Sequence, residues 1–269
     1  MAPLLGRSMK GAWRTRYTRH GRLPRMASSL IAVPAPRAPI YRVGRMPDPF
    51  APSPWAYAKP DGTFGNRFDD PGGRRGIPQE DRFRVLYCAS DSAGACAETV
   101  AYFRPELATM VDANATPPGS RVGRPIIPEK WRIERRIGAT VLHPSLRFVD
   151  MAAAETVQAL RPILAPLALS LGLREVDFST LAGPERLLTQ EAARYIYEQV
   201  DAAGEPLYAG LRYLSRLNPV WECWAIFADR LRHMVVRVDI IPANHPGLFE
   251  AARILGLAIE ESHGHYLLP

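Results

Sequence analysis

The chain has 269 residues, of which 47% are hydrophobic and 23% are charged. This composition is typical of a globular protein that buries a core, and the length suits one large domain or two small ones. The longest apolar stretch, residues 163–173, contains Pro166 and is shorter than the about 20 apolar residues that a membrane-spanning helix needs. We therefore expect no membrane span and no membrane partner.

The net charge of +7 is concentrated at the start of the chain. Residues 1–39 contain seven arginines, one lysine and no acidic residue, whereas the rest of the chain contains 26 basic and 27 acidic residues. We expect residues 1–38 to be a basic, disordered extension, with contact between this tail and nucleic acid as the alternative. The tail also has the composition of an organellar transit peptide. Met26 is an alternative start, so the role of this segment and the true start stay open.

The three cysteines are Cys88, Cys96 and Cys223, and no CxxC motif occurs. An odd number of isolated cysteines is typical of buried thiols in a reducing compartment, which indicates a cytoplasmic protein. His263 and His265 are the only pair that suggests a metal site. Histidines near a chain end are usually solvated, so we expect no metal.

Apolar runs and turn residues predict the elements up to residue 130. Residues 40–43 and 83–89 are expected strands, and residues 62–68 are a candidate strand edge. Ser90, Asp91 and Ser92 supply the N-cap chemistry for a helix that continues to about Phe103. Residues 104–130, rich in Pro and Gly, are expected to leave the core as an insertion.

The second half mixes helices with further strands. Strands are expected at residues 131–142, 176–178 and 207–215, and residues 223–228 and 234–241 are expected to form an antiparallel pair. Helices are expected at residues 152–171, interrupted by Pro162 and Pro166, at residues 185–200 with Pro184 in the first turn, and around residues 248–259. Because strands and helices do not alternate strictly, the pattern favours an α+β fold with mixed or antiparallel sheets and flanking helices.

Several common functional motifs are absent from the sequence. It contains no GxGxxG, P-loop or GxSxG motif, which argues against a Rossmann dehydrogenase, a P-loop NTPase and an α/β-hydrolase. Four short stretches remain as candidates for chemistry. The first is Tyr41–Arg42, in which an arginine interrupts an apolar strand. The second is the turn at residues 65–68, which reads Gly-Asn-Arg-Phe.

The other two stretches lie later in the chain. Tyr87 ends an expected strand, and Glu98 lies on the helix that follows, among small residues. Tyr213 and Ser215 share one face of an expected strand. Each stretch alone also has an ordinary structural reading: a paired arginine, a plain turn, a surface glutamate or a capping serine.

In this order the four stretches resemble the RES-domain family, named for an Arg, a Glu and a Ser. That family shows an aromatic–Arg pair, then a Gly-Gly-Arg-Trp-like turn, then a strand ending in Tyr-Ala-Ser. In this sequence the strand end is formed by Tyr87, Ala89 and Ser90, with Cys88 inserted after the tyrosine. Glu98 follows the tyrosine by 11 residues, and Ser215 stands in a Tyr-x-Ser-Arg segment before a Trp-rich strand. The resemblance covers about residues 40–230 and indicates one RES-like catalytic domain over residues 39–269.

The resemblance implies a fold like that of ADP-ribosyltransferase toxins and an enzyme that degrades NAD. Members cleave NAD by phosphorolysis or hydrolysis, and many are toxins neutralised by an Xre-type antitoxin. NAD would thus be the substrate, inorganic phosphate a candidate co-substrate, and no cofactor is expected. This sequence departs from the family pattern in three ways that bear on substrate access and partner binding. The turn reads Gly-Asn-Arg-Phe, the chain carries a basic extension at its start and a Pro-rich segment at residues 104–130, and the gap between Arg67 and Tyr87 is long.

The resemblance also assigns roles to residues. Glu98 would stabilise the oxocarbenium ion that forms as the nicotinamide–ribose bond breaks. Arg42 and Arg67 would bind the pyrophosphate. Ser215 would hold an amide or ribose hydroxyl, and Tyr87 would contact the nicotinamide ring. The aromatic residues Tyr41 and Tyr213 complete the expected binding site.

Two other functions are compatible with the sequence. One is a protein mono-ADP-ribosyltransferase that uses the same site. The other is a non-catalytic binding module whose basic tail contacts nucleic acid in a salt-sensitive way. The acceptor (phosphate, water or a protein), the presence of an antitoxin and the oligomeric state, including a homo-oligomer, do not follow from the sequence.

Overall fold

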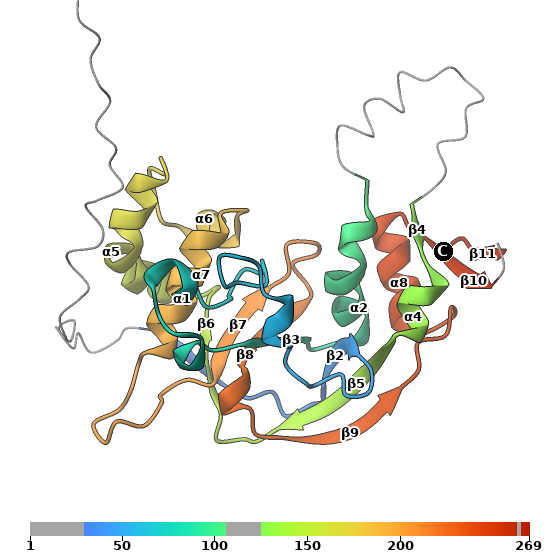
Figure 1. Cartoon of the computed structure of the whole chain (residues 1–269), viewed down its shortest axis with the longest axis horizontal. Coiled ribbons are helices and arrows are strands. Elements are labelled where there is room, and N and C mark those ends of the chain that lie inside the picture. The colour runs from blue at the N-terminus through green and yellow to red at the C-terminus, as the bar shows by residue number, and fades with distance from the viewer. Residues whose placement is uncertain (1–29, 106–124, 263–264) are drawn as a thin grey trace, which may run out of the picture.

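The computed structural model describes residues 30–105, 125–262 and 265–269. Its centre is a curved eight-stranded sheet in the order β1-β6-β7-β8-β3-β2-β5-β9 (Figure 1). Within it only β6 and β7 are parallel neighbours. The strands of this sheet are β1 (Ala32–Pro34), β2 (Ile40–Arg45), β3 (Val85–Ala89), β5 (Arg135–Leu142), β6 (Arg147–Asp150), β7 (Gly210–Leu214), β8 (Glu222–Phe227) and β9 (His233–Asp239). A smaller sheet contains β4 (Ile126–Ile127), β10 (Ala258–Ser262) and β11 (His265–Leu267).

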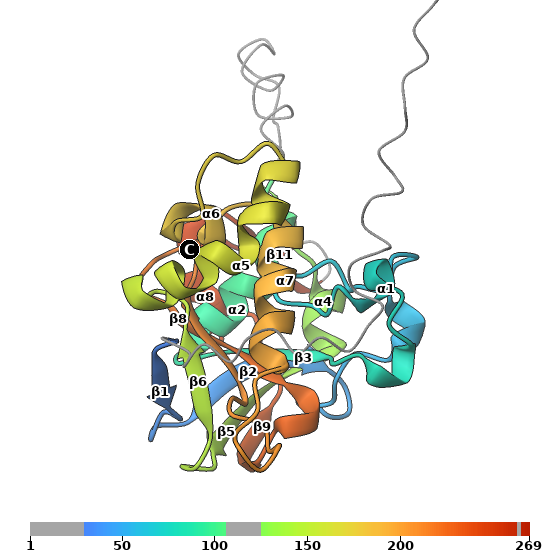
Figure 2. The ribbon, with the colours of Figure 1, turned by 90° about the vertical axis from the view of Figure 1, so that its left-hand side faces the viewer.

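The helices gather in two groups above one face of the large sheet (Figures 1 and 2). The first group is α2 (Ser92–Val100), α4 (Glu129–Ile133) and α8 (Pro246–Leu255), and the second is α5 (Ala154–Ser170), α6 (Phe178–Ala182) and α7 (Arg186–Tyr197). The loop between β2 and β3 carries the short helix α1 (Gly72–Arg75) and the 3-10 turns η2 (Trp55–Tyr57) and η3 (Gln79–Asp81). One large apolar core joins both groups to this face, and a second, smaller core lies on the opposite face.

Helix α2 forms as its sequence predicts. The Asp91 carboxylate caps it by accepting a hydrogen bond from the Gly94 N–H at 2.6 Å, which satisfies a backbone donor that has no partner inside the helix. Ala95, Cys96 and Ala97 are buried, and small side chains let α2 lie close to α8 and to the sheet. The helix continues into the 3-10 turn η4 (Ala101–Phe103).

Helix α5 is continuous although it contains Pro162 and Pro166. Each proline removes one backbone donor, so the carbonyl four residues earlier loses its helical partner. Both prolines and Gln158 are exposed. The freed carbonyl groups therefore face water, and the helix is not interrupted as the sequence suggested.

Other expectations for local structure are wrong. Residues 62–68 form a turn, because the Asp69 carboxylate captures backbone N–H groups of that segment. Residues 176–178 are not a strand, since Asp177 caps α6 by accepting from the Thr180 N–H at 2.7 Å. Pro184 lies before the cap of α7 rather than in its first turn, since the cap is Glu185.

Strands β8 and β9 do not pair with each other, contrary to expectation. Strand β8 lies between β7 and β3, whereas β9 pairs with β5 at the far edge. Both strands are rich in apolar residues, and such a pattern does not select a partner strand. The α+β class with a mixed sheet and flanking helices is confirmed.

The boundaries of the domain also differ from those expected. Residues 30–38, expected in the extension, belong to the fold: Leu30 is buried and β1 pairs with β6. Residues 1–29 lie outside the described residues, as do residues 106–124 of the expected insertion. The end of that insertion packs on the core through Ile127, which is fully buried. Among the helices of the described ranges, none has the length and apolarity needed to cross a bilayer.

A buried ion pair fixes the loop before β3 to α7. The Arg194 guanidinium donates to the Asp70 carboxylate at 2.9 Å, and the two side chains are 11% and 1% exposed. Asp70 also accepts from the Phe83 N–H at 2.9 Å and the Gly72 N–H at 2.7 Å. The pair therefore links α7, the start of α1 and the segment at Phe83 that precedes β3.

We expect Arg194→Met to lower the free energy of unfolding by about 3–5 kcal/mol, because the Asp70 carboxylate stays buried without its cation. Urea unfolding would measure the change. The matched control is Arg161→Met, which breaks an exposed pair with Glu175 and should cost less than about 1 kcal/mol. An equal loss of unfolding free energy in the two variants would contradict the prediction that the buried Asp70 carboxylate depends on Arg194.

Candidate functional site

Glu98 and Ser215 are brought together from elements 117 residues apart. The Ser215 hydroxyl donates to Glu98 Oε1 at 2.5 Å and also accepts from the Leu217 N–H at 3.1 Å. Ser215 is 3% exposed, whereas Glu98 lies on the exposed side of α2. One carboxylate oxygen is thus oriented by a buried hydroxyl, while the side chain as a whole remains open to solvent.

Arg67 lies between the two helix groups and close to this pair. One of its terminal nitrogens donates to the Leu181 carbonyl of α6 at 2.7 Å, and its guanidinium lies 5.2 Å from the Tyr213 ring. Burial lowers the pKa of Arg67, while Tyr213 and Glu98 act to raise it and Arg216 acts to lower it. The buried Nε has no hydrogen-bond partner among the described residues. The hydrogen bond to Leu181 engages one terminal nitrogen, and the other terminal nitrogen stays available to an anion.

A buried carboxylate shapes the turn that carries Arg67. Asp69 Oδ2 accepts from the backbone N–H groups of Phe64 at 2.9 Å and Asn66 at 2.6 Å. Burial raises the pKa of Asp69, and the hydrogen bonds from Asn66 and Phe64 oppose this effect. Gly65 within the turn has a φ of +81°, a conformation that favours glycine. Asp69 thus holds the turn together, and the turn carries Arg67 two residues before it.

Tyr87 supports the same turn from β3. Its hydroxyl accepts from the Phe68 N–H at 3.0 Å and lies 3.4 Å from Asp69 Oδ1. Burial raises the pKa of Tyr87 well above its usual value, and the Asp69 charge adds to this. The phenol therefore stays neutral and holds the turn, where the sequence suggested contact with a ligand ring.

Helix α7 clamps the turn from the other side. The Thr189 hydroxyl donates to the Arg67 carbonyl at 2.5 Å, and Gln190 Nε2 donates to the Asn66 carbonyl at 2.9 Å. Both side chains are buried. The backbone of Arg67 is consequently held by β3, α7 and the turn's own aspartate.

The Tyr213 ring packs against the Arg67 guanidinium. It is 4% exposed, and its ring centroid lies 5.0 Å from that of Phe68. Burial raises its pKa well above the usual value, with further contributions from Cys223 and Glu98. As the strand pattern predicts, Leu211, Tyr213 and Ser215 are buried on one side while Arg212 and Leu214 are only partly buried.

Arg42 bonds to backbone carbonyl groups of neighbouring segments. Its Nε donates to the Pro49 carbonyl at 2.6 Å and its Nη1 to the Tyr87 carbonyl at 3.0 Å, and burial lowers its pKa. Strands β2 and β3 share a single residue pair, Tyr41 with Ala89. The guanidinium thus bonds to β3 where the regular ladder between the two strands ends, through the backbone carbonyl of Tyr87.

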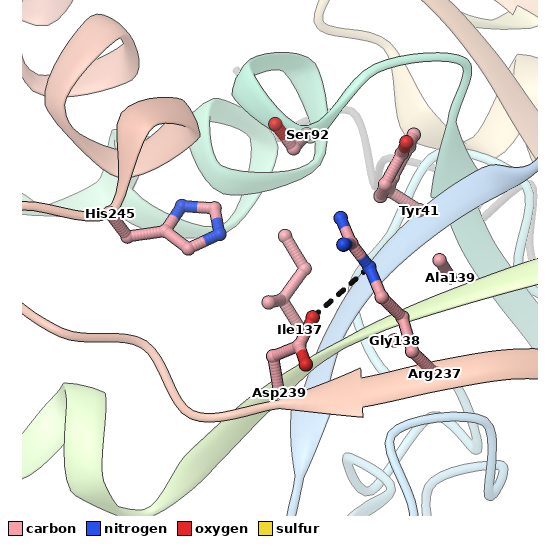
Figure 3. Close-up of a pocket in the computed structure, with 8 residues that line it drawn as sticks. All are labelled: Tyr41, Ser92, Ile137, Gly138, Ala139, Arg237, Asp239 and His245. Atoms are coloured by element: carbon pink, nitrogen blue, oxygen red, sulfur yellow. Dashed lines mark ion pairs between the residues drawn. The ribbon is translucent and has the colours of Figure 1, made fainter.

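Tyr41 lines a different, small pocket (Figure 3). The cavity measures about 10 Å³, room for one water molecule. Figure 3 shows Tyr41 together with Ser92, His245 and the ion pair between Arg237 and Asp239, whose Nε and Oδ2 are 3.1 Å apart. Glu98, Ser215 and Arg67 are not among the residues that line this pocket.

The sequence analysis missed three residues that build the site. Asp69 directly follows the Gly-Asn-Arg-Phe turn, and an aspartate after a glycine turn is a recognisable turn signal. Thr189 and Gln190 carry no such signal, because they lie on an ordinary amphipathic helix 122 and 124 residues from their partners. Within the described residues no group of three or more side chains suits a metal ion, and His263 lies outside them.

We expect Thr189→Val to loosen the turn that carries Arg67. The change keeps the shape of the side chain and leaves the Arg67 carbonyl without its donor, which costs about 1–3 kcal/mol. Hydrogen exchange at the amides of residues 63–69 would report the change locally. Thr189→Ser retains the hydroxyl and should preserve slow exchange there. Equally fast exchange in both variants would show that the hydroxyl does not hold the turn.

Comparisons with known proteins identify one family. A search of curated proteins finds no match. One solved structure, the crystal structure of the M. tuberculosis MbcT-MbcA toxin-antitoxin complex, aligns with a TM-score of 0.42 and 15% identity, over 78% of this chain and 87% of that one. The sequence matches the RES domain over residues 39–245, a range that contains the Arg67 turn, Glu98 and Ser215. The chain therefore belongs to the RES domain family.

Proposed function

We propose that this RES-domain protein cleaves the bond between nicotinamide and ribose in NAD. The observation that carries the proposal is the hydrogen bond between Ser215 and Glu98, which orients a solvent-open carboxylate beside Arg67. Cleavage of this bond leaves positive charge on the ribose ring. A carboxylate fixed in advance stabilises that charge without having to reorganise during the reaction.

The proposed reaction transfers the ribosyl group to an oxygen acceptor. The C–N bond breaks and its electron pair leaves with nicotinamide as a neutral base. The sugar carbon then bonds to an oxygen of phosphate, giving ADP-ribose 1-phosphate, or of water, giving ADP-ribose and a proton. Glu98 faces the oxocarbenium ion, and Ser215 keeps the carboxylate in place.

Arg67 supports the proposal as the cation for the pyrophosphate. Its guanidinium stacks on the Phe68 and Tyr213 rings, which hold the planar group in place, and a planar guanidinium matches the geometry of phosphate oxygens. Arg42 has a more indirect part, since its two hydrogen bonds go to backbone carbonyls. We assign it to holding β2 and the Tyr87 backbone in register, with direct binding of NAD as the alternative. Tyr87 bonds to the turn that carries Arg67, and the Tyr213 ring packs against the Arg67 guanidinium.

The biological role that fits this activity is that of a toxin. A protein that depletes NAD harms the cell that makes it, so a neutralising partner is part of the proposal, and the resemblance to the RES family suggests an Xre-type antitoxin. Transfer of ADP-ribose to a protein through the same site is the alternative reaction. It would appear as labelling of a protein by NAD with slow release of free products.

We expect Glu98→Gln to fold normally and to lower NAD turnover by about 10²–10³-fold, the cost of losing one preorganised electrostatic contact. Chromatography of NAD and its products, with and without inorganic phosphate, measures the rate and identifies the acceptor. Phosphate-dependent loss would indicate a phosphorylase, and phosphate-independent release of ADP-ribose would indicate a glycohydrolase.

The control for this experiment is Glu155→Gln, because Glu155 is an exposed glutamate on α5. Its turnover should equal that of the unmodified protein. Unchanged turnover in a folded Glu98→Gln variant would remove Glu98 from the mechanism. Absence of NAD loss by the unmodified protein in both buffers would reject the proposed reaction.

A further inference from the structure

Two arginines face each other across neighbouring strands near the candidate site. Arg45 at the end of β2 lies directly opposite Arg135 at the start of β5. Like charges in this position repel. Within the described ranges neither arginine forms an ion pair with a carboxylate. Such an arrangement concentrates positive charge that a bound anion would neutralise.

The two arginines point to the side of the sheet that carries the site. Along β2, Tyr41 and Val43 contact the large core beneath the helices, and Arg45 continues this alternation. On β5, Ile137 belongs to the same core, and Arg135 lies two residues before it. Both guanidinium groups therefore belong to the face covered by α2.

Aromatic rings flank the two arginines. The Arg45 guanidinium carbon lies 5.9 Å from the centre of the Tyr57 ring on η2. Tyr102, on η4, lies near both arginines: burial raises its pKa, and the charges of Arg135 and Arg45 oppose that rise. Tyr57 and Tyr102 are 66% and 65% exposed. Large flat rings this exposed offer faces on which a nucleobase can stack.

The position of Tyr102 connects this cluster to the catalytic pair. It follows Glu98 by four residues and lies on η4, the 3-10 turn that continues α2. Arg135 stacks 5.1 Å from Trp131 and donates to its carbonyl at 3.1 Å, which anchors the guanidinium while leaving most of its donors free. The cluster thus lies at the end of the helix that carries Glu98, and its Arg135 is held on β5 by Trp131 of α4.

We propose that Arg45 and Arg135, together with Tyr57 and Tyr102, form the subsite for the adenosine diphosphate half of NAD. The inference rests on the proposed function, which places the nicotinamide ribose at Glu98. The other half of that molecule carries phosphate and a purine, which match paired guanidinium groups and exposed tyrosines. Arg67 then contacts the phosphate nearer nicotinamide, and the arginine pair contacts the phosphate nearer adenosine.

Binding of ADP to the full-length protein tests the subsite without turnover. Calorimetry should show binding to the unmodified protein, and Arg45→Ala should weaken it by about tenfold or more, the loss expected for a charge-assisted contact to phosphate. Arg45 is exposed and its removal relieves repulsion with Arg135, so the melting temperature should be unchanged or higher. Arg136→Ala is the matched control, because Arg136 adjoins Arg135 but lies opposite Gly44 and faces away; it should bind ADP as the unmodified protein does.

The tyrosines are tested by comparing ADP with inorganic pyrophosphate. The unmodified protein should prefer ADP, and Tyr102→Ala should reduce that preference while leaving pyrophosphate binding unchanged. No binding of ADP at millimolar concentration, or equal weakening by Arg45→Ala and Arg136→Ala, would overturn the subsite.

Kinetics separate the subsite from the proposed reaction. If both are correct, Arg45→Ala raises KM for NAD and leaves kcat unchanged. Turnover of NAD with an unaltered KM in Arg45→Ala would reject the subsite and keep the reaction. ADP binding that depends on Arg45, in a protein that does not consume NAD, would keep the subsite and reject the reaction.

Discussion

The Asp69 carboxylate is the contact on which the candidate site depends. It is 3% exposed, yet it carries hydrogen bonds from two backbone N–H groups and lies beside the Tyr87 hydroxyl. A buried carboxylate is costly unless it is well bonded, so the turn at residues 63–69 closes around it. The closed turn fixes the backbone position from which the Arg67 side chain extends. The clamp from Thr189 and Gln190 then fixes the turn against α7 and, through α7, against the ion pair of Asp70 and Arg194.

Several arginines in this fold donate hydrogen bonds to backbone carbonyl groups. Arg42 donates to the carbonyls of Pro49 and Tyr87, Arg132 to those of Ile241, Glu260 and Glu261, and Arg230 to those of Tyr197 and Tyr208. A planar guanidinium with five donors can satisfy several carbonyl groups where strands end or separate. The basic residues of the folded part therefore contribute to architecture. Arg135 also donates to a carbonyl, that of Trp131, but it faces Arg45 on the neighbouring strand, and the two lie near exposed tyrosines.

The site is formed where two helix groups meet above one sheet face. Glu98 comes from α2, Ser215 follows β7, and Arg67 contacts the carbonyl of Leu181 in α6. Strands β2 and β3 share only one residue pair, so the loop between them can extend over the sheet and carry the Arg67 turn toward α2. Separate elements thus each contribute one polar group, while the core beneath them stays apolar.

The sequence by itself determined the local parts of this protein. The order of the aromatic–Arg pair, the glycine turn, the Tyr87–Glu98 spacing and the Tyr-x-Ser-Arg segment identified the family, and Asp91 predicted where α2 begins. These features depend on residues a few positions apart, for which capping and turn chemistry are sufficient.

Only the tertiary structure decided which of these residues meet. It joined Ser215 to Glu98, bonded the Tyr87 hydroxyl to the Arg67 turn, and bonded Arg42 to the backbone carbonyls of Pro49 and Tyr87. It also separated β8 from β9 and added Thr189 and Gln190 to the site. The physical reason is that strand pairing and helix packing bring together residues more than 100 positions apart, and an apolar pattern specifies that a face is buried without specifying what it is buried against.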